Sequence, residues 1–220
     1  MDATATSGSA EAGTPAEPTQ PPGAVKRALR RRLRADRERR SPAEQERVAE
    51  AVAAVVLEMP EVHAARCVAL YASMAGEPGT APLREVLRRR GVRVLLPVVL
   101  PDFDLDWAED DGATAPAGRL AVPHPGGPRL GLEAVAGADV VIAPAIAVDT
   151  RGRRLGHGGG CYDRALKRVV SPTLVVALVH DEELLDAAAE PIPVEPHDVL
   201  VTRVATPTRW VFLAAQPDHG

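Results

Sequence analysis

The chain has 220 residues, of which 45% are hydrophobic, and its formal net charge is −4. This length and apolar content fit one domain with a tail, because no linker interrupts the interior of the sequence. The negative charge argues against a dedicated nucleic-acid-binding protein. No apolar run is long enough to span a membrane, and the first residues lack the basic-then-apolar order of a signal peptide. We therefore expect no nucleic-acid partner, no membrane partner and a cytoplasmic location.

Lysine and cysteine are both scarce in this chain. Lys26 and Lys167 are its two lysines, so arginine carries nearly all of the positive charge. The two cysteines, Cys67 and Cys161, are far apart in the sequence. Their number and spacing indicate neither a disulfide framework nor a zinc site.

The N-terminal segment 1–23 consists mainly of Ala, Thr, Ser, Gly, Pro and Glu. Such a segment cannot bury enough apolar surface to offset the entropy lost on ordering. We expect a disordered tail over 1–23 and a single folded domain over 24–215.

A basic helix is predicted over residues 25–40. Lys26, Arg30 and Arg34 recur at a spacing of four and share one stripe of this helix. Two interpretations stay open: a solvated helix face, or Lys26 and Arg30 directed together at an anionic ligand. A capping-box pattern then begins a second predicted helix, over 42–58.

A strand–helix–strand unit follows, with strands over 66–73 and 92–99 and an amphipathic helix over 80–90. This order predicts parallel strands joined by a right-handed crossover. The fold class expected for the whole chain is therefore α/β, a three-layer, Rossmann-like domain with a mostly parallel sheet flanked by helices. Glu77 lies after the first of these strands, where open α/β sheets bind ligands. It is either a ligand-binding residue or an ordinary exposed loop glutamate.

A short strand over 103–107 is predicted to place Asp104 and Asp106 on one face and Trp107 on the other. The region 108–131 is rich in Pro, Gly and acidic residues, and we expect a long loop or small hairpin that covers a site. Trp107 is then either part of the core or a wall of the pocket.

The most informative passage is DTRGRRLGHGGGCYDRALK, residues 149–167. A buried strand is predicted before it, over 139–148, and a helix over 161–170. A glycine-rich loop between a strand and a helix is suited to binding phosphate through backbone N–H groups. Arg153 and Arg154 stand beside the loop. The spacing matches neither a Walker loop nor a dinucleotide-binding fingerprint, so the pattern predicts a polyanion site of another kind.

Two residues at the start of the helix after this loop have alternative roles. Asp163 either interacts with the helix dipole or binds Mg²⁺, which takes one or two carboxylates together with phosphate oxygens. Cys161 stands at the helix N-terminus, where the pKa of a thiol falls. A reactive cysteine is the less favoured interpretation of that position.

The C-terminal part continues the α/β alternation. The predicted elements are a strand over 173–179, a short helix over 182–189, an extended loop over 191–196, and strands over 199–205 and 209–214.

The segment RRLGHGGGCYDRAL, preceded by PAIAVDTRG, resembles the D-x-x-G-x-R-L-G-x-G-x-G-Y-Y-D-R signature of 5-formyltetrahydrofolate cyclo-ligases, also called 5,10-methenyltetrahydrofolate synthetases. Other segments resemble the same family in the same order, over about residues 25 to 206. They are the basic segment from Lys26 to Arg30, the loop from Tyr71 to Glu77, and the pair His197-Asp198.

This resemblance implies an enzyme that uses ATP to phosphorylate the formyl oxygen of 5-formyltetrahydrofolate. N10 then attacks the activated carbon, and phosphate leaves to give 5,10-methenyltetrahydrofolate. ATP and the folate would be the small-molecule partners, Mg²⁺ the cofactor, and the chain a monomer. Such chemistry needs positioning and charge neutralisation more than a protein nucleophile.

The resemblance also implies roles for individual residues. The catalytic residues would be Lys26, Arg154 and Tyr162. The ATP site would comprise Lys26, Arg27, Ala28, Leu29, Arg30, Arg154, Leu155, Gly156, His157, Gly158, Gly159, Gly160, Cys161 and Tyr162. The folate site would comprise Ala72, Met74, Glu77, Trp107, His157, Gly158, Gly159, Gly160 and Cys161. The metal ligands would be Asp163 and Asp198.

Two positions depart from the pattern of the family. Gly159 stands where a lysine is frequent, and Cys161 stands where the first of two tyrosines is common. These departures keep a second hypothesis open, a non-catalytic folate or nucleotide sensor on the same fold. A third hypothesis is a phosphotransferase that acts on another small acid, in which the Glu77 loop would have no pterin to recognise.

Overall fold

The computed structural model describes residues 21–117 and 122–213 of the chain. Most of the expected tail lies outside these residues. The first helix, α1, spans Pro22–Glu38, so residues 22 and 23 are helical and do not belong to a tail. None of the helices in the described ranges combines the length and the apolar character that crossing a membrane requires.

A seven-stranded sheet forms the centre of the domain, in the order β12-β11-β9-β6-β1-β2-β3. Its strands are β1 (Cys67–Leu70), β2 (Arg93–Val99), β3 (Leu105–Glu109), β6 (Val140–Pro144), β9 (Leu174–Leu178), β11 (Arg203–Ala205) and β12 (Trp210–Phe212). The pairs from β11 to β2 are parallel, whereas β3 and β12 are antiparallel edge strands. The inner strands β1 and β6 are buried along their whole length, which explains their continuous apolar sequences.

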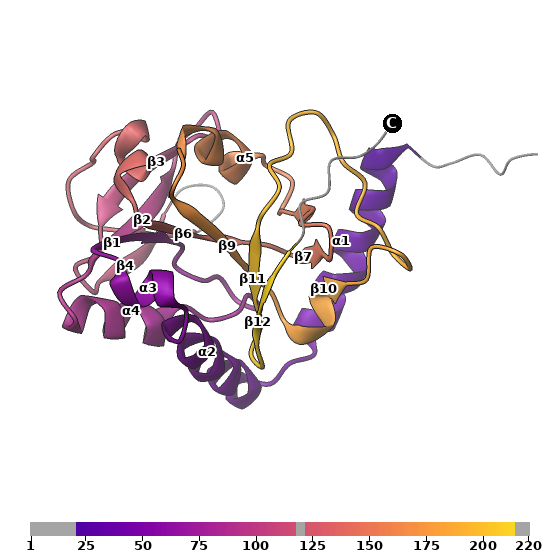
Figure 1. The fold of residues 1–220 in the computed structure, drawn as a ribbon, viewed down its shortest axis with the longest axis horizontal. Coiled ribbons are helices and arrows are strands. Elements are labelled where there is room, and N and C mark those ends of the chain that lie inside the picture. The colour runs from indigo at the N-terminus through magenta and orange to yellow at the C-terminus, as the bar shows by residue number, and fades with distance from the viewer. Residues whose placement is uncertain (1–20, 118–121, 214–220) are drawn as a thin grey trace, which may run out of the picture.

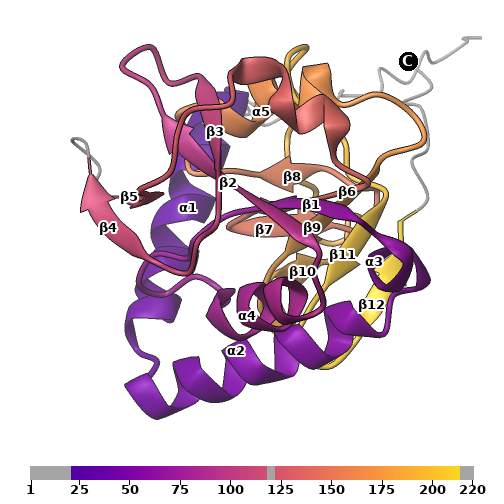
Figure 2. The same cartoon turned by 90° about the vertical axis from the view of Figure 1, so that its left-hand side faces the viewer.

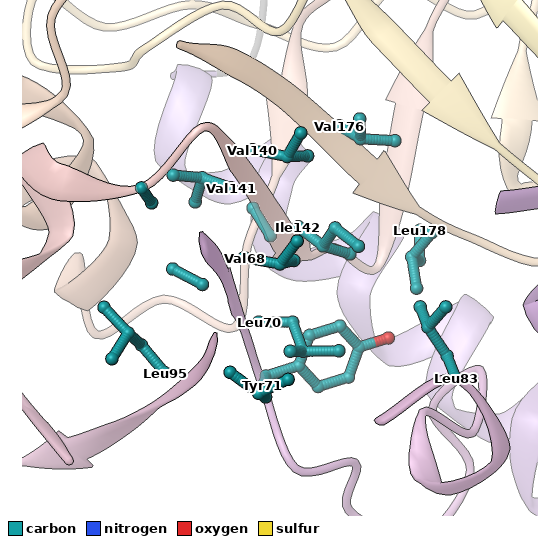
Figure 3. Close-up of a cluster of buried hydrophobic side chains, with 14 of the residues drawn as sticks. Val68, Leu70, Tyr71, Leu83, Leu95, Val140, Val141, Ile142, Val176 and Leu178 are labelled. Atoms are coloured by element: carbon teal, nitrogen blue, oxygen red, sulfur yellow. The ribbon is translucent and has the colours of Figure 1, made fainter. Parts of the chain in front are cut away.

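Helices cover both faces of this sheet, which confirms the three-layer α/β fold. Helices α2 (Pro42–Leu57), α3 (Pro60–Ala64) and α4 (Ala81–Arg89) lie on one face. Helix α5 (Cys161–Ala165) and the 3₁₀ helices η1 (Leu132–Gly137) and η2 (Leu166–Arg168) lie on the other (Figures 1 and 2). Figure 3 shows the core between these layers, where Leu70 of β1, Ile142 of β6 and Leu83 of α4 belong to one cluster.

A second, three-stranded sheet lies beside α1, as Figure 1 shows. It consists of β7 (Ala147–Asp149), β8 (Arg154–Leu155) and β10 (Leu184–Leu185). Leu29 and Leu33 of α1 pack on Ile146, Leu155 and Leu185 of this part of the domain. The helix therefore packs on the domain through two leucines. Its two buried charged residues, Lys26 and Arg37, lie on either side of these leucines along the helix.

Several predicted elements differ from the structure. The strand expected over 139–148 is two strands, β6 and β7, because Ile146 pairs with Leu155 instead of continuing the main sheet. The helix expected over 182–189 is wrong. Residues Asp181–Glu183 form the 3₁₀ helix η3, and β10 follows it because it pairs with β7. The helix expected over 161–170 is shortened to α5 and η2.

The region 108–131 contains a small hairpin, as one of the two alternatives predicted. Its strands are β4 (Thr114–Ala117) and β5 (Val122–Pro125), which pair antiparallel. The hairpin lies against β2, where the Val99 N–H donates to the His124 ring at 3.4 Å.

Candidate active site

One large pocket opens at the carboxyl ends of the central parallel strands, with a cavity of about 610 Å³. Tyr71 and Ala72, which directly follow β1, and Pro144, the last residue of β6, form part of its wall. The rest comes from α1, the loop after β1, β2, β3, the segment from β8 through the glycine-rich loop to η2, and the loop that ends at Asp198. This location and size are typical of small-molecule sites in open α/β folds.

Arginines of α1 hold the glycine-rich loop through its carbonyl groups. Arg30 Nε donates to the Gly156 carbonyl at 2.7 Å, and Arg34 Nη2 donates to the His157 carbonyl at 3.1 Å. Gly158 and Gly160 have φ values of +105° and +70°, which side-chain-bearing residues rarely adopt. Carbonyl oxygens repel phosphate, so bonding two of them to guanidinium groups makes the loop more favourable to an anion.

Lys26 lies at the centre of a carboxylate pair. Its side chain is 5% exposed, and Nζ lies 2.8 Å from Glu195 Oε2 and 2.6 Å from Asp198 Oδ2. The hydrogen bond from Lys26 holds the pKa of Glu195 below its usual value. Burial by itself would raise the pKa of Asp198, but the hydrogen bonds from Lys26 and from the Glu195 N–H, together with the charge of Lys26, outweigh it and the pKa is lowered. Both carboxylates are therefore ionised at neutral pH.

A candidate metal group is present at this position. Glu195, His197 and Asp198 each offer one ligand atom, and these atoms lie within 4.8 Å of one another. Asp163 does not belong to the group, because its carboxylate pairs with the guanidinium of Arg154. The structure thus places the two predicted metal ligands, Asp163 and Asp198, in separate ion pairs.

Glu77 is buried at the opposite wall of the pocket, with an exposed fraction of 7%. Its Oε2 accepts a hydrogen bond from the Met74 N–H at 2.7 Å, and its Oε1 lies 2.7 Å from His157 Nε2. The alternative of an ordinary exposed glutamate is therefore wrong. This carboxylate also joins the loop after β1 to the glycine-rich loop.

Tyr162 and Arg154 line the pocket and carry polar atoms without partners in the described part of the chain. These atoms are the Tyr162 hydroxyl and Arg154 Nε, both buried. Burial raises the pKa of Tyr162 far above its usual range, so the hydroxyl stays protonated and can donate a hydrogen bond. Arg154 Nη1 donates to the Pro144 carbonyl at 3.2 Å, which fixes the guanidinium beside the strand end.

Trp107 is fully buried, and its ring contacts Tyr162 edge to face, with centroids 6.5 Å apart. It does not line the pocket, so the expectation that it forms a pocket wall is wrong. Its strand, β3, turns it into the core behind Tyr162. The described residues of the β4–β5 hairpin do not line the pocket either, and their expected role as a cover stays a prediction.

Other predicted site residues divide into two groups. Ala72, Met74, Arg27 and the glycines from 156 to 160 line the pocket as expected. Ala28, Leu29 and Leu155 do not line it, and the two leucines belong to the core under α1.

Cys161 lines the pocket, but burial raises the pKa of its thiol, so the expectation of a lowered pKa is wrong. The short α5, of five residues, does not offset this burial.

The predicted site residues do not include five polar residues of the pocket wall: Tyr71, Arg164, Lys167, Glu195 and His197. Glu195 lies in an extended loop, where no sequence periodicity indicates which way the side chain points. Arg164 and Lys167 follow the glycine-rich loop, and their spacing of three on a helical segment was a usable signal.

Comparisons with known proteins agree with this geometry. Residues 22–207 match the model of the 5-formyltetrahydrofolate cyclo-ligase family. A 5-formyltetrahydrofolate cyclo-ligase of Mycolicibacterium smegmatis is 41% identical over 151 residues, which cover 66% of this chain and 76% of that protein. The enzyme of the same name from Escherichia coli is 33% identical over 183 residues, which cover 80% of this chain and 97% of that protein.

A solved structure supports the same assignment. The 5,10-methenyltetrahydrofolate synthetase of Aquifex aeolicus superposes with a TM-score of 0.72 at 26% sequence identity, over 89% of this chain and 96% of that one. The sequence match extends over nearly all of the described domain and includes every segment that lines the pocket. The chain therefore belongs to the 5-formyltetrahydrofolate cyclo-ligase family.

Proposed function

We propose that the large pocket is the site where this ligase closes the ring of 5-formyltetrahydrofolate to give 5,10-methenyltetrahydrofolate, with conversion of ATP to ADP and phosphate. The observation that carries the proposal is the contact of 2.7 Å between Glu77 and His157. It places a buried carboxylate next to a glycine-rich loop in one cavity, so that two different ligands can lie side by side.

ATP phosphates would occupy the side of the pocket formed by Lys26, Arg30 and the glycine-rich loop. Lys26 and Arg30 supply positive charge there, and both line the cavity. Arg154 and Tyr162 would complete this side, because their unpartnered donors are buried at the cavity wall and can meet oxygen atoms of a ligand. Unmade hydrogen bonds at buried donors are costly, so a ligand that satisfies them gains affinity.

The pterin ring would lie against Glu77, Ala72 and Met74. A carboxylate accepts strongly from ring and amino N–H groups. The Met74 N–H holds the carboxylate by a hydrogen bond and His157 lies beside it, so it presents a fixed acceptor. The formyl oxygen would then face the terminal phosphate of ATP at the glycine-rich loop, where transfer needs alignment and neutralisation of charge.

Mg²⁺ fits the carboxylates of Asp198 and Glu195, since this ion prefers oxygen ligands and takes one or two carboxylates. When bound with ATP, it would neutralise part of the phosphate charge. Lys26 holds both carboxylates and would shift toward the phosphates as the ion binds. Asp163 would then serve Arg154 and not the metal.

The chain would act as a monomer, as the resemblance to the family implies. Sedimentation analysis of the purified protein tests this expectation. Its proposed location is the cytoplasm, a compartment that supplies ATP.

The test of the function is a turnover assay with matched variants. Purified protein given 5-formyltetrahydrofolate, ATP and Mg²⁺ should produce the absorbance of the methenyl product together with equimolar ADP. Glu77→Gln should raise the KM for the folate at least tenfold and change the KM for ATP less than twofold. Binding of both ligands without product would contradict catalysis and indicate a sensor. ADP formation that does not depend on the folate would indicate another phosphotransferase.

A further inference from the structure

A buried ion pair outside the pocket joins α1 to the residues after β9. Arg37 Nε and Nη2 donate to the two oxygens of Glu183 at 2.7 and 2.8 Å. The exposed fractions are 4% for Arg37 and 1% for Glu183. Arg37 Nη2 also donates to the Ala145 carbonyl at 2.7 Å, where the chain leaves the main sheet. Burial by itself would lower the pKa of Arg37, but the hydrogen bond with Glu183 and the acidic groups around the guanidinium together outweigh it and raise the pKa, so the guanidinium stays protonated.

The ion pair continues into His180. Glu183 Oε2 accepts a hydrogen bond from the His180 N–H at 2.8 Å. The His180 ring is buried, and its Nε2 lies 3.1 Å from the Gly76 carbonyl oxygen. A carbonyl oxygen only accepts, so Nε2 carries a proton and the ring donates to Gly76. Burial lowers the pKa of His180, so the ring is neutral at pH 7.

Gly76 directly precedes Glu77. The hydrogen bond from His180 to the Gly76 carbonyl therefore fixes the backbone next to Glu77. Gly76 has a φ of +81°, and a Cβ built on it would lie 3.3 Å from the Cβ of Arg37. Arg37 therefore packs against the loop as well as pairing with Glu183. On the other side of Glu77, the Tyr71 hydroxyl donates to the Pro78 carbonyl at 2.9 Å. Both neighbours of Glu77 thus accept a hydrogen bond at their carbonyl group.

We propose that Arg37, Glu183 and His180 are positioning residues that set the direction of the Glu77 carboxylate and thereby the affinity for the folate but not for ATP. None of the three lines the pocket. A buried ion pair is weak evidence for stability, because desolvation offsets its attraction. Its specific consequence is geometric, since it fixes His180 and hence the Gly76 carbonyl. This inference rests on the proposed role of Glu77 in folate binding.

The test compares three variants with a matched control. Glu183→Gln removes the negative charge of the pair and changes the side-chain volume very little. His180→Leu removes the donor to Gly76, whereas His180→Gln retains an amide donor near the position of Nε2. The control is Asp110→Asn, which weakens a second buried bidentate pair, Asp110 with Arg84 at 2.7 and 2.8 Å, outside the pocket.

Hydrogen exchange is the first measurement, because it needs no ligand. The Met74 and Glu77 amides are bonded within the loop, to the Glu77 carboxylate and the Met74 carbonyl. Their exchange should speed up at least tenfold in Glu183→Gln and His180→Leu, less than threefold in His180→Gln, and not at all in Asp110→Asn. Unchanged exchange in the first two variants, or equal acceleration in the control, would overturn the proposal.

Affinity is the second measurement. Glu183→Gln and His180→Leu should raise the KM and the calorimetric Kd for 5-formyltetrahydrofolate about tenfold, because small displacements at a positioned group have large effects. The KM for ATP should stay within twofold. An equal rise in both KM values would overturn the selective role. Wild-type protein that does not bind the folate would refute the proposed function instead, and the exchange data would then decide the positioning role.

Discussion

Replacing Lys26 by methionine tests the central charge of the site. The Lys26 side chain is 5% exposed, and its ammonium group bonds two carboxylates at 2.6 and 2.8 Å. Methionine keeps the length of the buried stem but leaves the Asp198 carboxylate, 14% exposed, without its cation. A hydrogen bond between charged groups contributes about 1.5–3 kcal/mol. Because Asp198 retains some contact with water, we expect a loss near the middle of that range, about 2 kcal/mol.

For a chain of this length, that loss corresponds to a Tm lower by about 4–8 °C. Calorimetric unfolding measures it, and Asp198→Asn in the same chain should restore part of the stability because no unpaired charge remains. The effect on catalysis should be larger. Removing one charged donor from a developing phosphoryl charge typically lowers turnover about 10²–10³-fold. We therefore expect kcat/KM for ATP to fall by about two orders of magnitude.

Two results would refute this reasoning about Lys26. Turnover within twofold of wild type would show that Lys26 is only a structural partner of the carboxylates. A double variant that is less stable than Lys26→Met alone would show that the two carboxylates do not depend on its charge.

Three further predictions concern the loop, the pH dependence and the metal. Gly158→Ala should raise the KM for ATP at least tenfold, because φ is +105° there, whereas Gly159→Ala should change it less than threefold; equal effects would contradict the conformational argument. The lowered pKa of His180 means that the unfolded chain, with a pKa of about 6.5, binds a proton first on acidification. As the pH is lowered from 6.5, the free energy of unfolding should therefore decrease by up to about 1.4 kcal/mol per pH unit, until the pKa of the folded state is reached. Urea unfolding at a series of pH values measures this decrease, and the His180→Gln variant should lack the part that His180 contributes. Asp198→Asn should raise the Mg²⁺ concentration for half-maximal turnover about tenfold, and Asp163→Asn should not raise it; the reverse order in a Mg²⁺ titration would assign the metal to Asp163.

The sequence was sufficient for the parts of the fold that depend on local pattern. The basic first helix and the strand–helix–strand unit from 66 to 99 are present because their apolar spacing and caps act over a few residues. The break between β6 and β7 was not predictable in this way. Residues 140–149 are apolar nearly throughout, and what divides them is pairing with Leu155 and Leu185, which lie in other parts of the chain.

The same distinction applies to the site. The glycine-rich loop and Glu77 were identifiable because a motif or a position after a strand marks them. Glu195 was not identifiable, because its link to Lys26 joins residues 169 apart in the sequence. Trp107 was misplaced because strand alternation tells which residues share a face but not which layer that face contacts.

The scarcity of lysine gives the pocket an unusual chemical identity. Lys26 and Lys167 are the two lysines of the whole chain, and both line the same cavity. Apart from the α-amino terminus, the primary amines of this protein are therefore confined to its candidate active site. An acylating or aldehyde reagent would act as a selective label, with Lys167 exposed and Lys26 shielded. The mass increments of the intact protein, counted with and without nucleotide, would report directly on occupancy of the site.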